Sequence, residues 1–195
     1  MKNIMETILH RRSIRRYAAR PVEEEALQRI LTAGLYAPSA GGRQGPLFAV
    51  SEDREVNLTL GKLKRAASNP AMARNGHFVS KNQPSIADDP NLKDSFYGAP
   101  VVITLFGPKN FLFAAEDCAM AAENMMLAAD ALGIGSCYIG QGWQAFSTPY
   151  GQEILKHWGV PATHYAVAQL LLGCPLEGDP HPAPKPRKEG RILHF

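Results

Sequence analysis

The chain has 195 residues, 45% of them hydrophobic, and its 21 basic and 18 acidic residues give a formal net charge of +3. This length supports one domain with a substantial core and excludes two large ones, so we expect a single domain over residues 1–195. The mild charge argues against a nucleic-acid-binding protein, which usually carries a stronger basic excess. The sequence has no apolar run as long as a signal-peptide core or a membrane span, which predicts a cytoplasmic protein without a membrane partner.

The first half of the chain predicts three helices and one strand. Asn3 and Glu6 have the spacing of a helix N-cap with a reciprocating carboxylate, so a short helix should run to about Arg12. Three glutamates then open an amphipathic helix that ends before Pro38. These helices are expected over 4–12, 22–37 and 53–67, and a buried strand is expected over 46–51.

Residues 68–98 are polar and rich in proline, asparagine and aspartate, and they show no sustained hydrophobic period. An irregular segment of this length is unusual in a compact domain. We interpret it either as a lid or cover over a functional site or as a segment with a short helix that the pattern does not reveal.

The second half of the chain alternates strands and helices and ends in a proline-rich, basic tail over 175–195. An alanine-rich helix over 113–133 has a narrow polar stripe, so most of its circumference should be buried. One small domain can hardly cover such a helix, which favours a dimer core. The other elements are strands over 99–107, 135–140 and 164–173 and a helix over 149–159. This alternation predicts an α+β or α/β fold.

Arginines are concentrated in "RRSIRR", directly after the first expected helix. In an extended chain Arg11, Ser13 and Arg15 point to one side, because side chains alternate along a strand. Two guanidinium groups and a hydroxyl make a compact receptor for a phosphate group. The alternative is a solvated basic patch. Arg16 and Arg20 are assigned only a solvated or salt-bridged surface role.

The segment "APSAGGRQGP", residues 37–46, gathers glycines after the second helix. Glycine lets a planar ligand approach the backbone, and Ser39 and Gln44 offer hydrogen bonds. An ordinary helix-to-strand loop is the alternative. The sequence has no HExxH, GxSxG or CxxC motif, so it predicts neither a metal site nor a catalytic nucleophile. Cys118, Cys137 and Cys174 are expected to be buried free thiols.

These features together resemble the FMN-dependent nitroreductases. The resemblance implies an α+β fold with a central, mostly antiparallel sheet flanked by helices, assembled as an intertwined homodimer with two FMN molecules at the interface. The matching stretches are "RRSIRRY" at 11–17, "APSAGGRQ" at 37–44, "YGAPVVI" at 97–103, "DCAMAAENMMLAADALGIGSCYIG" at 117–140 and "PKPRK" at 184–188.

The resemblance also implies roles for individual residues. Arg11, Arg12, Ser13 and Arg15, joined by Arg187, would hold the FMN phosphate and ribityl chain. Pro38, Ser39 and Ala40 of the other subunit would lie along the isoalloxazine ring, and Ile139, Gly140 and Gln141 would border its reactive edge with a backbone N–H near N5. The contact to the N1/O2 edge is left open among Lys62, Lys64 and Arg65.

Two positions depart from the pattern of the family. Gly42 stands where asparagine is common, and Pro46 stands where tryptophan is common. The first change affects one polar contact to the flavin, and the second changes the wall of the substrate pocket.

The activity that the resemblance implies is a ping-pong reaction in which NAD(P)H reduces FMN and an acceptor, such as a nitroaromatic or a quinone, is then reduced. No catalytic side chain is expected, because the flavin supplies the chemistry. The alternatives are an FMN-binding carrier or regulatory protein without turnover, and a flavin-consuming or dehalogenating enzyme on the same fold.

Overall fold

The computed structural model describes residues 3–68 and 80–195. Every helix and strand that the sequence predicts is present, with small differences at the ends. In chain order the elements are α1 (Ile4–His10), α2 (Glu24–Leu35), η1 (Ala40–Gly42), β1 (Leu47–Ser51), α3 (Arg54–Ala67), β2 (Val101–Pro108), α4 (Ala114–Ala131), β3 (Gly135–Ile139), η3 (Gly142–Phe146), α5 (Pro149–His157) and β4 (His164–Gly173).

The four strands form one sheet in the order β1-β2-β4-β3, and each neighbouring pair is antiparallel. This arrangement confirms the α+β expectation. The central strands β2 and β4 are apolar over most of their length because both of their faces are covered. On β2, for example, Ile103 belongs to the core on one side of the sheet and Val102 to the core on the other.

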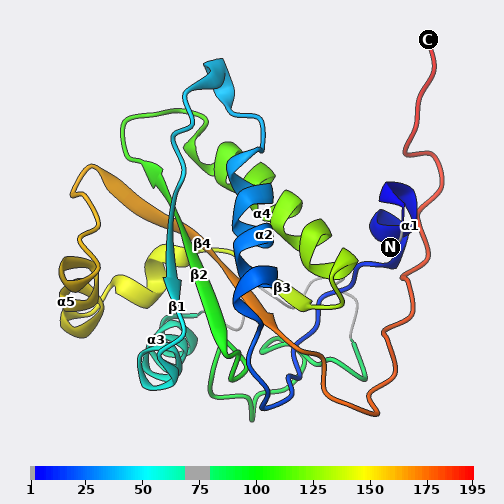
Figure 1. Cartoon of the computed structure of the whole chain (residues 1–195), viewed down its shortest axis with the longest axis horizontal. Helices are drawn as coiled ribbons and strands as arrows, with labels where there is room; N and C mark the ends of the chain where they lie inside the picture. Colours follow the sequence, from blue (N-terminus) through cyan, green and yellow to red (C-terminus); the bar gives the residue numbers. More distant parts are fainter. Residues whose placement is uncertain (1–2, 69–79) are drawn as a thin grey trace.

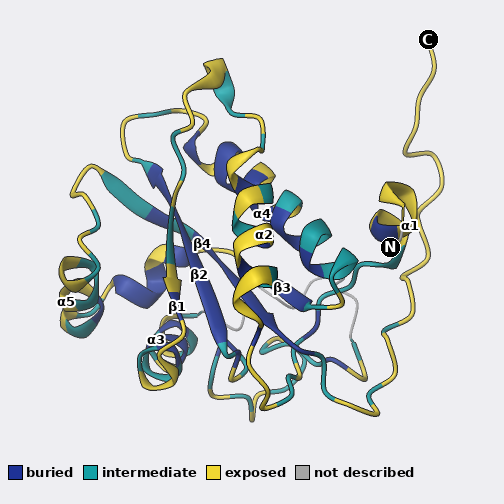
Figure 2. Cartoon of the chain, viewed as in Figure 1, coloured by how far each residue is buried: buried dark blue, intermediate teal, exposed yellow. Residues whose placement is uncertain are grey.

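Helices cover both faces of this sheet (Figure 1). Helices α2 and α4 pack on one face, where Ile30 and Met125 join the apolar side chains of the strands. On the opposite face, Leu60 of α3 and Phe146 of η3 pack against the sheet, with α5 beside them. The burial colours show the same layering, with buried central strands and an exposed outer surface on α2 (Figure 2). The sheet therefore separates two apolar cores.

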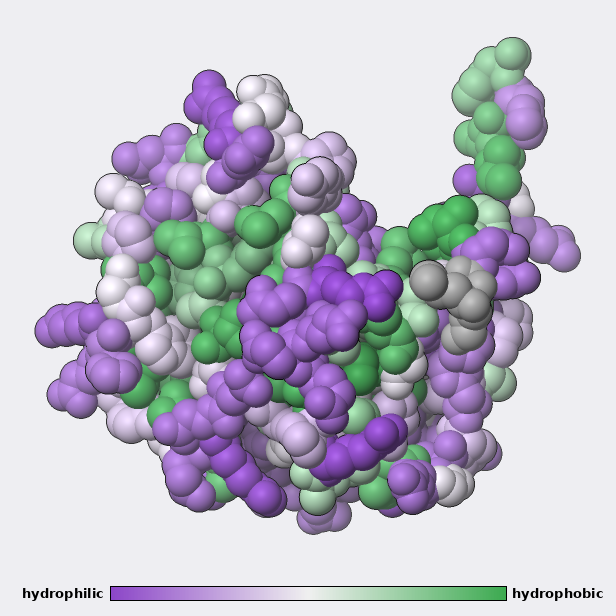
Figure 3. Space-filling view, viewed as in Figure 1, coloured by the Kyte–Doolittle hydropathy of each residue, from purple (hydrophilic) through white to green (hydrophobic). Residues whose placement is uncertain are grey.

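Helix α1 lies apart from these layers, beside the extended C-terminal tail (Figure 1). Its start is fixed by the expected capping box: Asn3 Oδ1 accepts from the Glu6 N–H, and Glu6 Oε2 accepts from the Asn3 N–H, both at 2.9 Å. Figure 3 shows apolar surface on α1 and on the outer part of the tail. The exposed residues there include Ile4, Leu9, Ile192 and Phe195.

The structure describes only part of the segment expected to form a lid, because residues 69–79 lie outside the described residues. Residues 80–98 contain turns and no helix, so the short helix considered for this segment is not found in that stretch. Asp94 organises its end by accepting from the N–H groups of Phe96 and Gly98, each at 2.7 Å. A lid or cover function for 68–98 stays a prediction.

Three features of the described residues bear on the class of protein. The helices in 3–68 and 80–195 are all too short or too polar to cross a membrane. In the same ranges, histidine, cysteine and acidic side chains form no group of three that could hold a metal ion. Cys118, Cys137 and Cys174 are buried and free, as the sequence predicts.

Candidate functional site

The arginine segment, residues 11–15, leaves α1 in an extended conformation. The helix ends at Arg11, whose φ of −48° and ψ of 132° are not helical. Ser13 then forms a parallel bridge with Ser136 of β3, and the Ile14 N–H donates to the Ser136 carbonyl at 2.9 Å. The segment therefore runs in an extended conformation alongside β3 at Ser13 and Ile14.

The side chains of Ser13 and Arg15 both reach the thiol of Cys137 on β3. Burial raises the pKa of this thiol, and the neighbouring Arg15 cation opposes that rise. Arg15 also lies over the ring of Tyr97, at 5.8 Å from its centroid. One side of the arginine segment thus gathers a hydroxyl and a guanidinium group against β3.

Two guanidinium nitrogens of the arginine segment are buried without a partner among the described residues, namely Nε of Arg12 and Nε of Arg15. Burial lowers the pKa of Arg12, and the nearby cations of Arg187 and Arg11 lower it further. Arg187, more than 170 positions along the chain, is thus close enough to Arg12 to repel it. Buried donors among like charges need an anion, so this region is suited to a phosphate group.

Gln83 fixes the position of Arg15. Its Oε1 accepts from the Arg15 N–H at 2.5 Å, and its carbonyl accepts from Arg15 Nη1 at 2.8 Å. Gln83 Nε2 donates to Asp179 at 3.3 Å, and Asp179 pairs with Arg16 at 3.2 Å. The salt-bridged surface role predicted for Arg16 is confirmed. Sequence reasoning missed Gln83, because a glutamine in an irregular polar segment has no periodic pattern to mark it.

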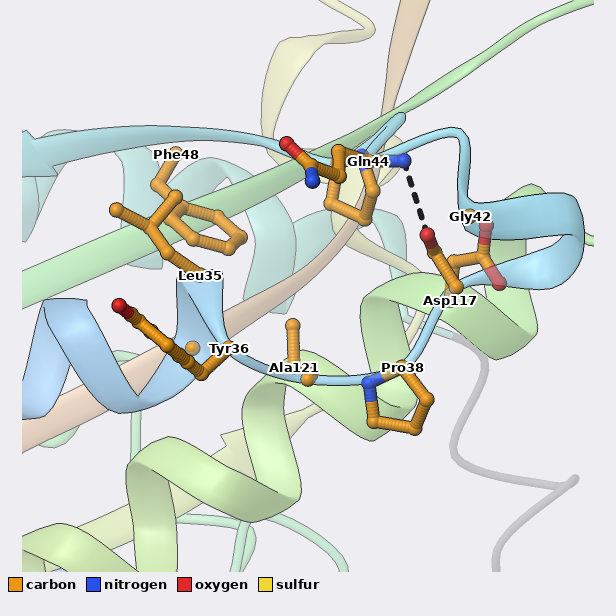
Figure 4. Close-up of a pocket in the computed structure, with 12 residues that line it drawn as sticks. Leu35, Tyr36, Pro38, Gly42, Gln44, Phe48, Asp117 and Ala121 are labelled. Atoms are coloured by element: carbon orange, nitrogen blue, oxygen red, sulfur yellow. Dashed lines mark hydrogen bonds between the residues drawn. The ribbon is translucent and has the colours of Figure 1, made fainter.

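The glycine loop, residues 37–46, forms one wall of a cavity of about 790 Å³. In Figure 4 the end of α2, the loop and β1 surround this space, with Pro38 and Asp117 at one end and Leu35 and Phe48 at the other. The volume is within the range of small-molecule sites. The cavity wall is largely apolar, which suits a planar aromatic group.

Polar contacts hold the glycine loop in its shape. The Gln44 N–H donates to Ser39 Oγ at 2.9 Å, the dashed bond in Figure 4, and the Ala40 N–H donates to Asp117 Oδ1 at 2.9 Å. Asp117 is buried on α4, so it anchors the loop to the core. Gly42 has a φ of +63°, a conformation that asparagine also tolerates. This backbone requirement explains why glycine can replace asparagine at position 42.

The third predicted element begins at Ile139, the last residue of β3, and continues through Gly140 and Gln141 to the start of η3; residues 139–142 form the turn after β3. Gln141 is left-handed, with φ 56° and ψ 48°. The Lys64 ammonium of α3 donates to the carbonyls of Gly140 at 2.8 Å and Gln141 at 2.9 Å and to Gln144 Oε1 at 3.1 Å. Burial lowers the pKa of Lys64 to about 8, so the ammonium form predominates at neutral pH.

These hydrogen bonds bear on which residue would contact the N1/O2 edge of the flavin, a choice that the sequence leaves open. A lysine ammonium has three N–H groups, and Lys64 donates all three to the protein. Arg65 donates through Nε to the Leu92 carbonyl at 3.0 Å, and Lys62 is exposed. Lys64 is therefore a structural donor in the protein. One sequence signal could have identified this role: Lys64 comes four residues after Leu60 and therefore lies on the buried face of α3.

Within one protomer, the predicted residues form two groups. The arginine segment and the turn at 139–141 both adjoin β3, and Arg12 is close enough to Asp130 of α4 for this carboxylate to raise its pKa. The glycine loop is anchored at Asp117, thirteen residues earlier on the same helix. At 1.5 Å per residue the two anchors lie about 20 Å apart. Pro38, Ser39, Ala40 and Gln44 are therefore distant from the arginine segment of their own protomer.

An α+β protein whose sheet edge carries two buried guanidinium nitrogens, Arg12 Nε and Arg15 Nε, without a partner among the described residues has a site suited to an anion such as a phosphate ester. Residues 8–174 match the model of the Nitroreductase family, and the chain belongs to that family.

Relatives and solved structures agree with this membership. A protein from Archaeoglobus fulgidus, provisionally named NADH dehydrogenase/NAD(P)H nitroreductase, is 34% identical over 91% of this chain and 88% of its own length. The NADPH-flavin oxidoreductase of Vibrio harveyi is 30% identical over 99% of this chain and 73% of its own length. A nitroreductase with bound FMN from Bacteroides fragilis has a TM-score of 0.82 and 29% identity, with both chains covered completely.

Proposed function

We propose that this chain is an FMN-dependent oxidoreductase that takes electrons from NAD(P)H and passes them to nitroaromatic, quinone or related acceptors in a ping-pong reaction. The observation that carries the proposal is the pair of buried guanidinium nitrogens, on Arg12 and Arg15, that have no partner within residues 3–68 and 80–195. A flavin phosphate would satisfy them. The similarity to an FMN-bound nitroreductase over the whole chain supports the same cofactor.

The proposed roles follow the two groups of residues. Arg11, Arg12, Ser13, Arg15 and Arg187 bind the phosphate and ribityl chain, because their cations and hydroxyl converge next to β3. Ile139, Gly140 and Gln141 border the reactive edge of the ring. When bound, FMN supplies the two-electron chemistry. The protein contributes binding, orientation and exclusion of water.

The glycine loop serves a second site in this proposal. Pro38, Ser39, Ala40 and Gln44 lie too far from the arginine segment of their own protomer, so we assign them to the flavin of a partner in an intertwined homodimer. The exposed apolar residues on α1 and the tail support this assembly, because they need a cover.

Subunit complementation tests the shared site. A variant with Arg15→Ala and a variant with Ser39→Trp would each have two defective sites as homodimers. Co-expression should give heterodimers with one intact site of two, and the purified heterodimer should retain about half of the FMN that the wild-type dimer retains. Recovery would fail if each protomer held FMN with its own glycine loop.

The activity itself is tested by an anaerobic spectrum of the purified protein. We expect a yellow protein whose flavin absorbance bleaches with NADH or NADPH and returns when an acceptor is added. Colour without bleaching would favour a carrier or regulatory protein. Loss of the flavin itself, or release of halide from a halogenated aromatic, would favour a flavin-consuming or dehalogenating enzyme. A colourless protein that FMN does not reconstitute would contradict the flavin assignment.

A further inference from the structure

Lys64 is a buried cation whose partners are all neutral. Its exposed fraction is 3%, and its ammonium bonds two backbone carbonyls and one amide oxygen. No charged side chain of the described residues pairs with it, since burial is the sole cause of its pKa shift. A buried lysine costs free energy that a leucine at this position of α3 would not. The role of the hydrogen bonds from Lys64 is therefore to stabilise the turn whose oxygens accept them.

These bonds set the direction of the turn's backbone N–H groups. The carbonyl and the N–H of a trans peptide unit point in opposite directions, and cis bonds are absent from the described residues. Because the Gly140 carbonyl points to Lys64, the Gln141 N–H points away from α3. Gly140 and Gln141 are exposed, so that N–H is directed toward open space next to β3.

The turn needs such support because its conformation is strained. Gln141 is left-handed, which is sterically unfavourable for a residue with a side chain. A second buried side chain helps: Gln169 Nε2 of β4 donates to the Gly142 carbonyl at 3.0 Å. Three consecutive carbonyls, of residues 140, 141 and 142, are thus held by two buried side chains from α3 and β4.

We propose that Lys64 is a positioning residue that holds the 140–142 turn so that the Gln141 N–H faces the reactive edge of the flavin. This inference rests on the proposed function. A donor that is fixed before the ligand binds needs no reorganisation during the reaction. The flavin N5 accepts a hydrogen bond when oxidised and carries a hydrogen when reduced, so a donor aimed at it favours the oxidised form. Loss of Lys64 should raise the midpoint potential.

The test compares the holoprotein with Lys64→Met, which keeps the length of the side chain and removes its three donors. The midpoint potential of bound FMN should rise by about 30 mV, which corresponds to a tenfold change in the relative binding of its two oxidation states. The matched control is Lys62→Met, which removes the same charge from an exposed position two residues away and should leave the potential unchanged. An unchanged potential in Lys64→Met would overturn the proposal.

Hydrogen exchange of the apoprotein separates this inference from the proposed function. Backbone amides over 139–145 should exchange at least tenfold faster in Lys64→Met than in Lys62→Met, whether or not FMN binds. Faster exchange in a protein that does not bind FMN would reject the proposed function and, with it, the role toward flavin. Equal exchange rates in the two variants would contradict the proposal that Lys64 holds the turn. If Lys64→Met does not fold, Gln144→Met removes one of the three acceptors and should give a smaller rise in potential, whose absence would also overturn the proposal.

Discussion

The arginine segment contacts β3, Lys64 contacts the turn that follows β3, and these cations use their donors in opposite ways. Arg12 and Arg15 each keep a buried guanidinium nitrogen that has no partner in the part of the chain that the structure describes. Lys64 donates every N–H to neutral oxygens of the protein. The difference suggests that the arginines are arranged for an anion that comes from outside, whereas the lysine is part of the framework.

The largest expected effect concerns the buried charge of Lys64. Its pKa falls from the ordinary 10.5 to about 8 because of burial. Between these values the unfolded chain binds more protons than the folded one, so the unfolding free energy rises with pH. Relative to Lys64→Met, the wild-type protein should gain roughly 3 kcal/mol between pH 7 and pH 10.5.

Urea unfolding of both proteins at the two pH values measures this gain, with Lys62→Met as the control that should show none. The comparison with a variant removes the contributions of tyrosines and cysteines that titrate in the same range. A difference in stability that stays constant with pH would contradict a charged, buried Lys64.

The next effect concerns the affinity for FMN. In the proposed site, Arg15→Ala and Arg187→Ala would each remove a charge-assisted phosphate contact worth about 1.5–3 kcal/mol. The dissociation constant of FMN should rise about 10- to 150-fold in each variant. Fluorescence titration of the apoprotein measures it. Arg16→Ala is the control, because Arg16 already pairs with Asp179. If both variants keep the wild-type affinity, the arginine segment is not the phosphate site.

A smaller effect is expected for the residue that supports Arg15. Gln83→Ala leaves the Arg15 N–H without its acceptor in a part-buried position, at a cost of about 1–3 kcal/mol. Thermal unfolding should show this loss, and FMN binding should weaken in parallel because the guanidinium group loses its anchor. Loss of stability with unchanged FMN affinity would indicate that Gln83 supports the fold without placing Arg15.

The smallest effect belongs to the glycine loop. Ser39→Ala removes one hydrogen bond, to the Gln44 N–H, with a net value of about 0.5–1.5 kcal/mol. Denaturant unfolding should detect it, and Ser39→Thr, which retains the hydroxyl, should restore most of the stability. An alanine variant as stable as the wild type would show that this bond does not hold the loop.

The sequence predicts the elements of this fold well because each has a local signal. The Asn3–Glu6 capping box, the alternation around Ser13 and the apolar run of β2 depend on neighbouring residues. The contacts that sequence reasoning missed are long-range. Gln83 lies 68 positions from Arg15, and Lys64 lies 76 positions from Gly140. Such contacts depend on tertiary packing, which periodicity does not encode.

The distance between the arginine segment and the glycine loop also depends on tertiary structure and not on local sequence. Arg15 and Ser39 are both marked by their local motifs, yet the length of α4 decides that they do not meet within one protomer. The motifs predict which residues bind the cofactor, and the stretch of α4 between Asp117 and Asp130 separates the two groups of predicted residues.

The comparison of FMN with riboflavin, which lacks the phosphate, tests the central claim most directly. Calorimetric titration of the apoprotein should show much tighter binding of FMN than of riboflavin in the wild type and in Lys64→Met. In Arg15→Ala this preference should shrink by about 10- to 150-fold, since the contact removed is the one to the phosphate. Equal binding of the two ligands by the wild-type protein, or an unchanged preference in Arg15→Ala, would contradict the account.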